Sequence, residues 1–302
     1  MDQFNVYKDM KARTNGEIYI GVVGPVRTGK STFIKRFMNL MVLPNIEDEN
    51  DRNRANDELP QSSSGKTIMT TEPKFVPNEA VSIKTEEGIE LNVRLIDCVG
   101  YMVEGATGHM EGEEERLVKT PWFDYEIPFT KAAAIGTKKV ITEHSTIGVV
   151  VTCDGSFGEI AAKQYEPAEE ETIKQLKALK KPFVVLLNTI HPYSESTKQL
   201  AAEKEEKYQT KVLPMNLEQM KKEDIYEIIK SVLMEFPISS IGFYVPRWTE
   251  MLKKDHPLKM ELLQMARDVI TEKTTMRDIY EEQEKEYEYI TGQKLESVAM
   301  DS

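Results

Sequence analysis

The sequence is poor in cysteine and histidine, with two and four of them among 302 residues. Cys98 and Cys153 each close an apolar run, so we interpret them as small core residues rather than as a disulfide framework. This usage indicates a reducing compartment. The histidines show no ligand spacing with the cysteines, which disfavours a zinc site. They are His109, His144, His191 and His256.

Basic residues are fewer than acidic ones, 39 against 51, and the formal net charge is −12. That balance argues against a nucleic-acid backbone or an anionic lipid surface as the main partner. The first residues are acidic and lack a signal-peptide core, and no run reaches the roughly 18 apolar residues of a membrane-crossing helix. Hydrophobic residues at 40% and charged residues at 30% describe a soluble globular chain. We expect a cytoplasmic protein.

The most informative stretch is residues 24–31, Gly-Pro-Val-Arg-Thr-Gly-Lys-Ser, which matches the phosphate-binding P-loop pattern. An apolar, β-branched run at 18–23 precedes it, and helical spacing follows at 33–41, so we expect a strand, the loop and a helix. Lys30 would reach the β- and γ-phosphates, and the Ser31 hydroxyl would ligate Mg²⁺. Further nucleotide contacts are expected from Gly24, Val26, Arg27, Thr28, Gly29 and Thr32. The alternative, a glycine-rich turn before a core helix, leaves Lys30 and Ser31 unexplained.

Arg27, inside the loop, allows two interpretations. Its guanidinium either lies near the γ-phosphate, as an arginine supplied within the same chain, or pairs with an acidic surface residue.

A second motif, Asp97-Cys-Val-Gly100, follows an apolar strand predicted at 91–96. In P-loop enzymes such an aspartate holds the Mg²⁺ shell, and the glycine N–H senses the γ-phosphate. A threonine between the two motifs completes the metal site, and we favour Thr70 and Thr71 over Thr67. The alternative for each threonine is a hydroxyl that satisfies turn backbone.

Base recognition is predicted from residues 188–191, Asn-Thr-Ile-His, which follow a buried strand predicted at 182–187. Guanine-specific relatives of this fold carry Asn-Lys-x-Asp here. Asn188 is kept as a nucleotide contact, but His191 replaces the anionic acceptor, and a neutral imidazole offers a single acceptor nitrogen. ATP is therefore favoured over GTP.

Strand and helix signals alternate along most of the chain, which predicts an α/β fold with a mostly parallel sheet flanked by helices. Residues 1–237 are expected to form the P-loop domain, and 238–302 to begin a second, mainly helical region with a long helix from 258 to about 289. Residues 44–65 and 101–128 read as loops. Trp122 and Phe123 either serve a function in the second loop or pin it to the body.

Five segments together closely resemble the stage IV sporulation protein A family, the spore-coat morphogenetic ATPases of endospore-forming bacteria. These are residues 21–38, 57–62, 67–77, 97–101 and 144–149. The resemblance implies an ATP hydrolase on a translation-factor-like GTPase fold, with nucleotide work carried by Lys30, Thr70, Thr71 and Asp97.

The same resemblance implies partners. Hydrolysis would drive polymerisation of the protein into a basement layer on the outer forespore surface, in the mother-cell cytoplasm. A small amphipathic membrane peptide would localise it, and further coat and cortex proteins would be tethered to it. Family members are longer and carry a carboxy-terminal domain that contacts this peptide.

Three other functions stay open from the residues alone: a GTP-dependent switch, a scaffold that binds nucleotide without turnover and, more distantly, a small-molecule kinase. No glutamine is placed to orient water, and Glu104 is only a candidate base. Slow turnover is therefore expected.

Overall fold

The computed structural model describes residues 16–60, 72–84, 90–112, 114–238, 243, 245, 247–272 and 274–280. Its centre is a six-stranded sheet in the order β10-β9-β8-β1-β3-β2, parallel except for β2. The strands are β1 (Glu17–Val23), β2 (Lys74–Lys84), β3 (Glu90–Asp97), β8 (Ile147–Cys153), β9 (Phe183–Asn188) and β10 (Val212–Met215). The predicted α/β class is confirmed.

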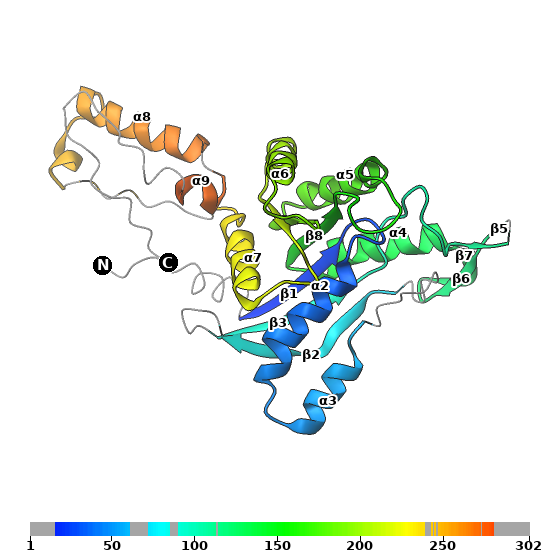
Figure 1. The fold of residues 1–302 in the computed structure, drawn as a ribbon. Helices are drawn as coiled ribbons and strands as arrows, with labels where there is room; N and C mark the ends of the chain where they lie inside the picture. Colours follow the sequence, from blue (N-terminus) through cyan, green and yellow to red (C-terminus); the bar gives the residue numbers. More distant parts are fainter. Residues whose placement is uncertain are drawn as a thin grey trace.

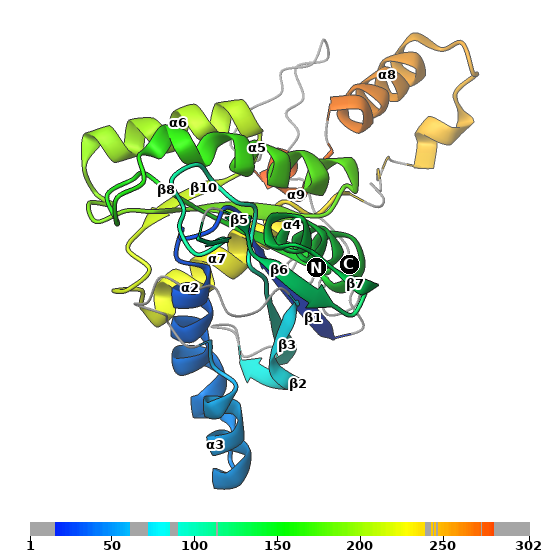
Figure 2. The same cartoon turned by 90° about the vertical axis from the view of Figure 1, so that its right-hand side faces the viewer.

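Helices cover both faces of the sheet (Figures 1 and 2). They are α2 (Lys30–Phe37), α3 (Glu49–Asp57), α4 (Phe129–Lys139), α5 (Ala162–Ala178), α6 (Glu195–Tyr208) and α7 (Lys222–Met234). Two π-helical turns, η1 (Met38–Val42) and η3 (Val140–His144), extend α2 and α4, and the short 3-10 turn η2 (Leu43–Asn45) follows η1.

The central strands are apolar on both sides because both faces are buried. In β8, Val149 and Val151 pack with α2 and α7, whereas Val150 packs with α5 and α6. Each strand residue therefore alternates between two hydrophobic clusters, as the pleat requires. The free cysteines Cys98 and Cys153 are buried, in agreement with their interpretation as core residues.

The segment predicted as a loop at 101–128 contains two short hairpins. The first pairs β4 (Met110–Glu111) with β5 (Glu114–Glu115), and the second pairs β6 (Leu117–Thr120) with β7 (Phe123–Pro128). Trp122 and Phe123 are half-buried, and the Lys139 ammonium lies 5.8 Å from the Trp122 ring centroid. The second hairpin leads directly into α4 (Figure 1).

Two further sequence predictions are wrong. The stretch predicted as a loop at 44–65 contains α3, whose first N–H groups at Asn50 and Asp51 are capped by the Asp48 carboxylate. The long helix expected from residue 258 is interrupted. Helix α8 (Pro257–Glu272) ends, and a separate helix α9 (Met276–Tyr280) follows. The Asp278 side chain in α9 accepts the N–H groups of Thr274 and Thr275, which lie just before this helix.

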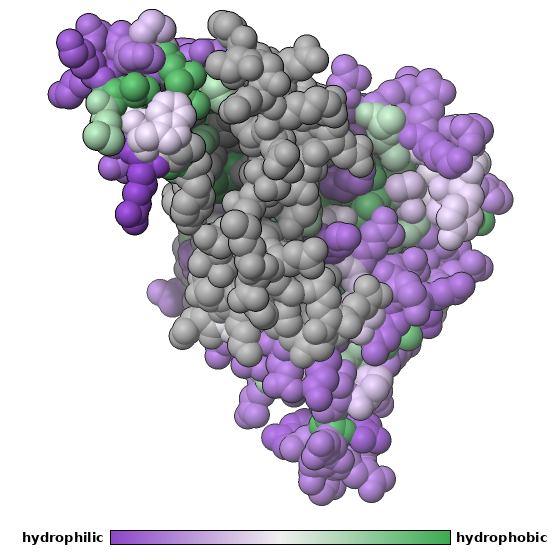
Figure 3. All heavy atoms as spheres, turned by 90° about the vertical axis from the view of Figure 1, so that its left-hand side faces the viewer, coloured by the Kyte–Doolittle hydropathy of each residue, from purple (hydrophilic) through white to green (hydrophobic). Residues whose placement is uncertain are grey.

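The region after residue 237 contacts the sheet domain through α9. Met276 is buried, and its N–H donates to the Phe236 carbonyl at 3.0 Å. The Arg277 guanidinium lies 3.5 Å from the Glu235 carboxylate, whose pKa is raised by burial. In contrast, η4 (Arg247–Met251) and α8 leave apolar side chains at the surface, seen at one corner of Figure 3.

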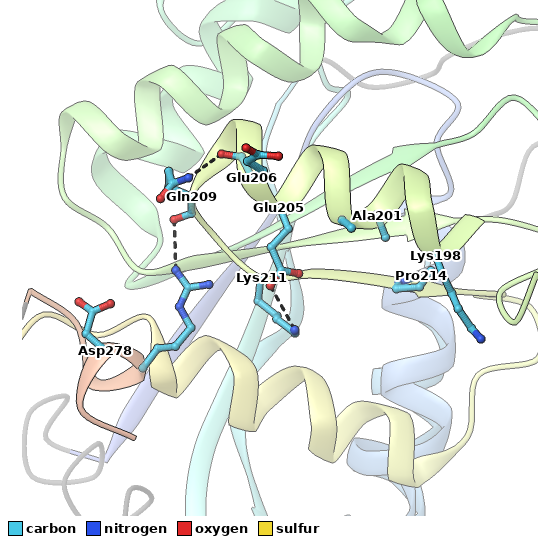
Figure 4. Close-up of a pocket in the computed structure, with 10 residues that line it drawn as sticks. Lys198, Ala201, Glu205, Glu206, Gln209, Lys211, Pro214 and Asp278 are labelled. Atoms are coloured by element: carbon cyan, nitrogen blue, oxygen red, sulfur yellow. Dashed lines mark hydrogen bonds and ion pairs between the residues drawn. The ribbon is translucent and has the colours of Figure 1, made fainter. Parts of the chain in front are cut away.

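A groove of about 680 Å³ lies between α6, β10 and α9 (Figure 4). Several of its charged side chains are engaged with the protein itself: Lys211 pairs with Glu205 at 3.2 Å, and Arg277 donates to the Gln209 carbonyl at 3.4 Å. Among the described residues, no helix combines the length and apolar character that a bilayer crossing requires.

Candidate functional site

The phosphate loop joins β1 to α2 at the carboxyl edge of the parallel strands. Gly29 caps α2 in the left-handed conformation, with φ of 104°. A Cβ at this position would lie 2.7 Å from the Asn188 amide nitrogen, so a glycine is required for both backbone and space. The N-terminus of α2 therefore points its free N–H groups into the loop, where an anion is favoured.

Lys30 is buried at the first position of α2. Its ammonium donates to the carbonyls of Gly24, at 3.4 Å, and Pro25. Burial lowers the pKa of Lys30, while the nearby Cys98 and Asp97 oppose the shift. A buried ammonium that donates to neutral carbonyls is a strong attractor for phosphate oxygens.

Asp97 reaches the loop because β3 pairs in parallel with β1, with Val22 opposite Asp97. The Ser31 hydroxyl lies 3.4 Å from Asp97 Oδ2, and Asp97 Oδ1 is buried without a hydrogen-bond partner. Burial raises the pKa of Asp97 to about 6, against the lowering effect of Lys30.

This hydroxyl–carboxylate pair fits a magnesium ion. Both donors are oxygens, which Mg²⁺ prefers, and the unpartnered Asp97 oxygen is available to accept from a water of its shell. Such a site uses few protein ligands, because Mg²⁺ keeps several waters. The described residues contain no cluster of three or more acidic, cysteine or histidine side chains that could hold a metal ion.

Gly100 packs against the loop so closely that a Cβ would lie 2.2 Å from the Gly24 carbonyl oxygen and 2.6 Å from Lys30 Nζ. Its φ is 96°, which also requires glycine. Its N–H donates to the Thr137 hydroxyl on α4 at 3.2 Å. The backbone of Gly100 is therefore part of the wall around the Lys30 ammonium.

The residue after Gly100 is bonded to the phosphate loop. The Val26 N–H donates to the Tyr101 carbonyl at 2.9 Å, and the Tyr101 N–H donates to the Gly24 carbonyl at 3.3 Å. The Val26 side chain is buried in a separate apolar cluster with Val103 and other residues of the insertion. The loop and the start of the insertion thus form one packed unit.

Arg27 has a left-handed φ of 61° and an exposed side chain. Its guanidinium donates to the Thr107 hydroxyl at 3.0 Å and to the Thr107 carbonyl at 3.3 Å. Neither sequence-based alternative describes this contact, since the partner is a threonine of the insertion and no acidic residue.

Asn188 supports the loop from the other side. Its amide nitrogen donates to the Thr28 carbonyl at 3.0 Å, and its amide oxygen accepts the Leu217 N–H at 3.3 Å. Thr28 is buried, its hydroxyl donating to the Pro25 carbonyl, and Thr32 is half-buried on α2. Asn188 therefore fixes the position of the loop, in addition to any contact it makes with a base.

The structure brings together most of the residues predicted to bind nucleotide. Thr67, Thr70 and Thr71 lie outside the described residues. Thr107, which contacts Arg27 of the loop, and Thr137, which contacts Gly100, were missed by the sequence interpretation, because each comes from a distant segment and belongs to no local motif.

A strand-to-helix loop that ends in a glycine with left-handed backbone, followed by a buried lysine and a serine beside an aspartate, defines a P-loop nucleotide-binding domain. The chain belongs to the stage IV sporulation protein A family. Residues 1–237 match the ATPase domain of stage IV sporulation protein A, and residues 238–302 match its middle domain.

Curated relatives agree with this assignment. The chain is 54% identical over 275 residues to stage IV sporulation protein A of Clostridioides difficile strain 630, covering 91% of this chain and 56% of that protein. It is 47% identical over 302 residues to the Bacillus anthracis protein of that name, covering 99% and 61%. The chain thus spans about three-fifths of the length of these relatives.

A crystal structure of a GTP-binding protein from the archaeon Sulfolobus solfataricus in complex with GDP is also similar in part. It covers 75% of this chain and 55% of its own, at 14% identity and a TM-score of 0.41.

Proposed function

We propose that the domain is a magnesium-dependent ATP hydrolase whose turnover drives self-assembly of a spore-coat basement scaffold around the forespore. The match to a sporulation ATPase domain supports the cellular role. The observation that carries the chemistry is the buried Asp97 oxygen without a partner, 66 residues from Ser31 in sequence yet beside its hydroxyl.

Each residue has a role in this proposal. Lys30 and the loop N–H groups neutralise the β- and γ-phosphates, Ser31 provides a direct oxygen to the metal, and Asp97 acts through a water of the metal shell. Thr70 or Thr71 would supply the second hydroxyl. A magnesium ion held by these residues would supply positive charge that offsets the charge developing on the phosphates.

Adenine is proposed as the base. The position of the guanine-reading aspartate is taken by His191, which is exposed and uses its backbone N–H to contact the Thr189 hydroxyl at 3.2 Å. Thr189, at the position where guanine-specific relatives of the fold carry a lysine, is fully buried. A site without the paired anionic acceptor loses the contact by which guanine is selected.

Turnover is proposed to be slow. Tyr101, the residue after Gly100, does not present a free hydroxyl to orient water, because this hydroxyl donates to Gln175 on α5 at 2.8 Å. The Glu104 side chain, the candidate base, is exposed. Positioning of the triphosphate without a group that orients water leaves much of the barrier in place. A turnover on the order of hundreds per second would contradict this view.

The test compares phosphate release from ATP and GTP with magnesium present. Lys30→Ala is expected to reduce release to background, whereas Lys35→Ala, at an exposed position of the same helix, should retain the parent rate. A clear preference for GTP would instead support a GTP-dependent switch. Phosphorylation of an added small molecule would indicate a kinase.

Assembly is tested by sedimentation with ATP, with a non-hydrolysable analogue, and without nucleotide. The experiment uses this chain and a full-length relative, because the chain spans only part of the relatives' length. Pelleting that requires ATP supports the proposal. Equal pelleting with the analogue would show that bond cleavage is not the trigger, and equal pelleting of Lys30→Ala would favour a scaffold without turnover.

The membrane peptide and the coat and cortex proteins expected from the family resemblance remain proposed partners. Co-sedimentation of each with ATP-assembled full-length protein, and failure to do so with Lys30→Ala, would support them.

A further inference from the structure

Thr137 occupies a position where its hydroxyl meets the phosphate site from behind. The side chain is fully buried on α4, and its hydroxyl donates to the Ala133 carbonyl one helical turn earlier, at 2.8 Å. This leaves the oxygen lone pairs as acceptors, and the Gly100 N–H donates to them at 3.2 Å.

The Gly100 N–H has a single proton, so the Thr137 hydroxyl and a bound phosphate oxygen would compete for it. In the described structure it is bound to Thr137, while a Cβ added to the same residue would lie 2.2 Å from the Gly24 carbonyl oxygen and 2.6 Å from Lys30 Nζ. A terminal phosphate held by Lys30 would lie beside the Gly100 backbone. To donate to this phosphate, the Gly100 N–H must turn away from α4, and it leaves Thr137 only for another acceptor because a buried N–H does not stay without a partner.

We propose that Thr137 is a positioning residue that holds the Gly100 N–H on α4 until the terminal phosphate of a nucleoside triphosphate replaces it. This inference rests on the proposed nucleotide-binding function. A diphosphate has no terminal group to compete, so it leaves the bond intact. The exchange separates Gly100 from α4, and α4 directly follows the β6–β7 hairpin of the insertion.

The test replaces the hydroxyl by a methyl group of the same size, in Thr137→Val. The Gly100 N–H then lacks its resting partner, so a triphosphate is bound more tightly while a diphosphate is not. One hydrogen bond of ordinary strength corresponds to about 3- to 10-fold in affinity. The measured quantity is the ratio of the Kd for ADP to the Kd for a non-hydrolysable ATP analogue, by calorimetry with magnesium.

Two control variants isolate the bond. Thr137→Ser keeps the acceptor and is expected to keep the parent ratio. Thr172→Val removes an equally buried helical hydroxyl, on α5, that makes the same contact to a carbonyl one turn earlier, Ala168, at 2.7 Å. A loss of stability alone would move both affinities together in any of these variants, and would leave the ratio unchanged.

A higher ratio in Thr137→Val, with parent ratios in both controls, supports the inference. A parent ratio in Thr137→Val overturns it and leaves the proposed function standing. A parent chain that binds neither nucleotide overturns the proposed function and this inference with it. Where thermal unfolding shows that Thr137→Val does not fold, Thr137→Ala removes the same acceptor and gives the same reading.

Discussion

Two carboxylates, one buried and one half-buried, lie on opposite sides of the sheet and differ in how their oxygens are used. Glu169, on α5, accepts from the Lys204 ammonium at 2.7 Å with one oxygen and from the Thr152 hydroxyl with the other. Asp97, at the end of β3, contacts Ser31 at 3.4 Å with one oxygen and has no partner for the other.

The difference separates a carboxylate that holds the fold together from one that is kept ready for a ligand. Glu169 is 1% exposed with both oxygens satisfied, which is the usual state of a buried charge. The Asp97 side chain is half-buried, with Oδ1 buried and without a hydrogen-bond partner, and burial raises its pKa to about 6. An uncompensated buried acid beside a phosphate loop indicates a site rather than a structural contact.

Removal of Glu169, the carboxylate with both oxygens hydrogen-bonded, should have the largest effect on stability. Glu169→Ala leaves Lys204 nearly buried without its partner, and we expect a loss of about 3–5 kcal/mol in the free energy of unfolding. Urea-induced unfolding without nucleotide measures it. Glu170→Ala, which breaks a half-exposed pair with Lys207, is the control and should lose no more than about 1 kcal/mol. Equal losses in the two variants would contradict the comparison.

Asp97, the carboxylate with one oxygen without a partner, should matter for turnover instead. Asp97→Asn keeps the shape and removes the charge that orders the metal shell, so ATP hydrolysis should fall about 100-fold or more. Its stability without nucleotide at neutral pH should not fall below that of the parent, because an uncompensated buried charge is lost. Activity is measured by phosphate release. An active Asp97→Asn, or one that unfolds as readily as Glu169→Ala, would remove the distinction.

The pKa of Asp97 predicts a pH dependence that Asp97→Asn lacks. Because the folded-state pKa of about 6 exceeds the ordinary value of 3.8, the folded chain binds this proton more tightly than the unfolded chain. Asp97 therefore favours folding below about pH 4, and this contribution is lost as pH rises through about 6.

The difference in unfolding free energy between parent and Asp97→Asn should change by on the order of 2 kcal/mol across this window. Denaturant curves at several pH values measure it, since the other titrating groups are common to both chains. Parallel curves for the two proteins would show that the carboxyl is not perturbed.

The smallest effect is expected from Thr152→Val. The substitution conserves shape and removes one of the two partners of Glu169, while Lys204 continues to hold the other oxygen. We expect a loss of about 1.5 kcal/mol in unfolding free energy, with ATP hydrolysis unchanged. A change in hydrolysis without a change in stability would place the Glu169 network in the site.

Much of the site could be predicted because its main parts are local. The spacing of Gly24, Gly29 and Lys30 dictates a left-handed turn into a helix, and the chemistry of that turn needs no distant partner. Asp97 follows an apolar strand, and parallel strands meet at one edge of a sheet. In contrast, α3 was missed because its sequence is highly charged and buries only Ala55, so no apolar periodicity marks it.

What the sequence alone determined is therefore a phosphate loop, an acid at a strand end and the alternation of strands and helices, since these depend on neighbouring residues. Only the tertiary structure decided that Asn188 braces the loop, that Thr107 binds Arg27, and that Thr137 accepts the Gly100 N–H. These contacts depend on strand register and on where each helix lies across the sheet. Packing of the whole domain fixes both, and no local pattern records the result.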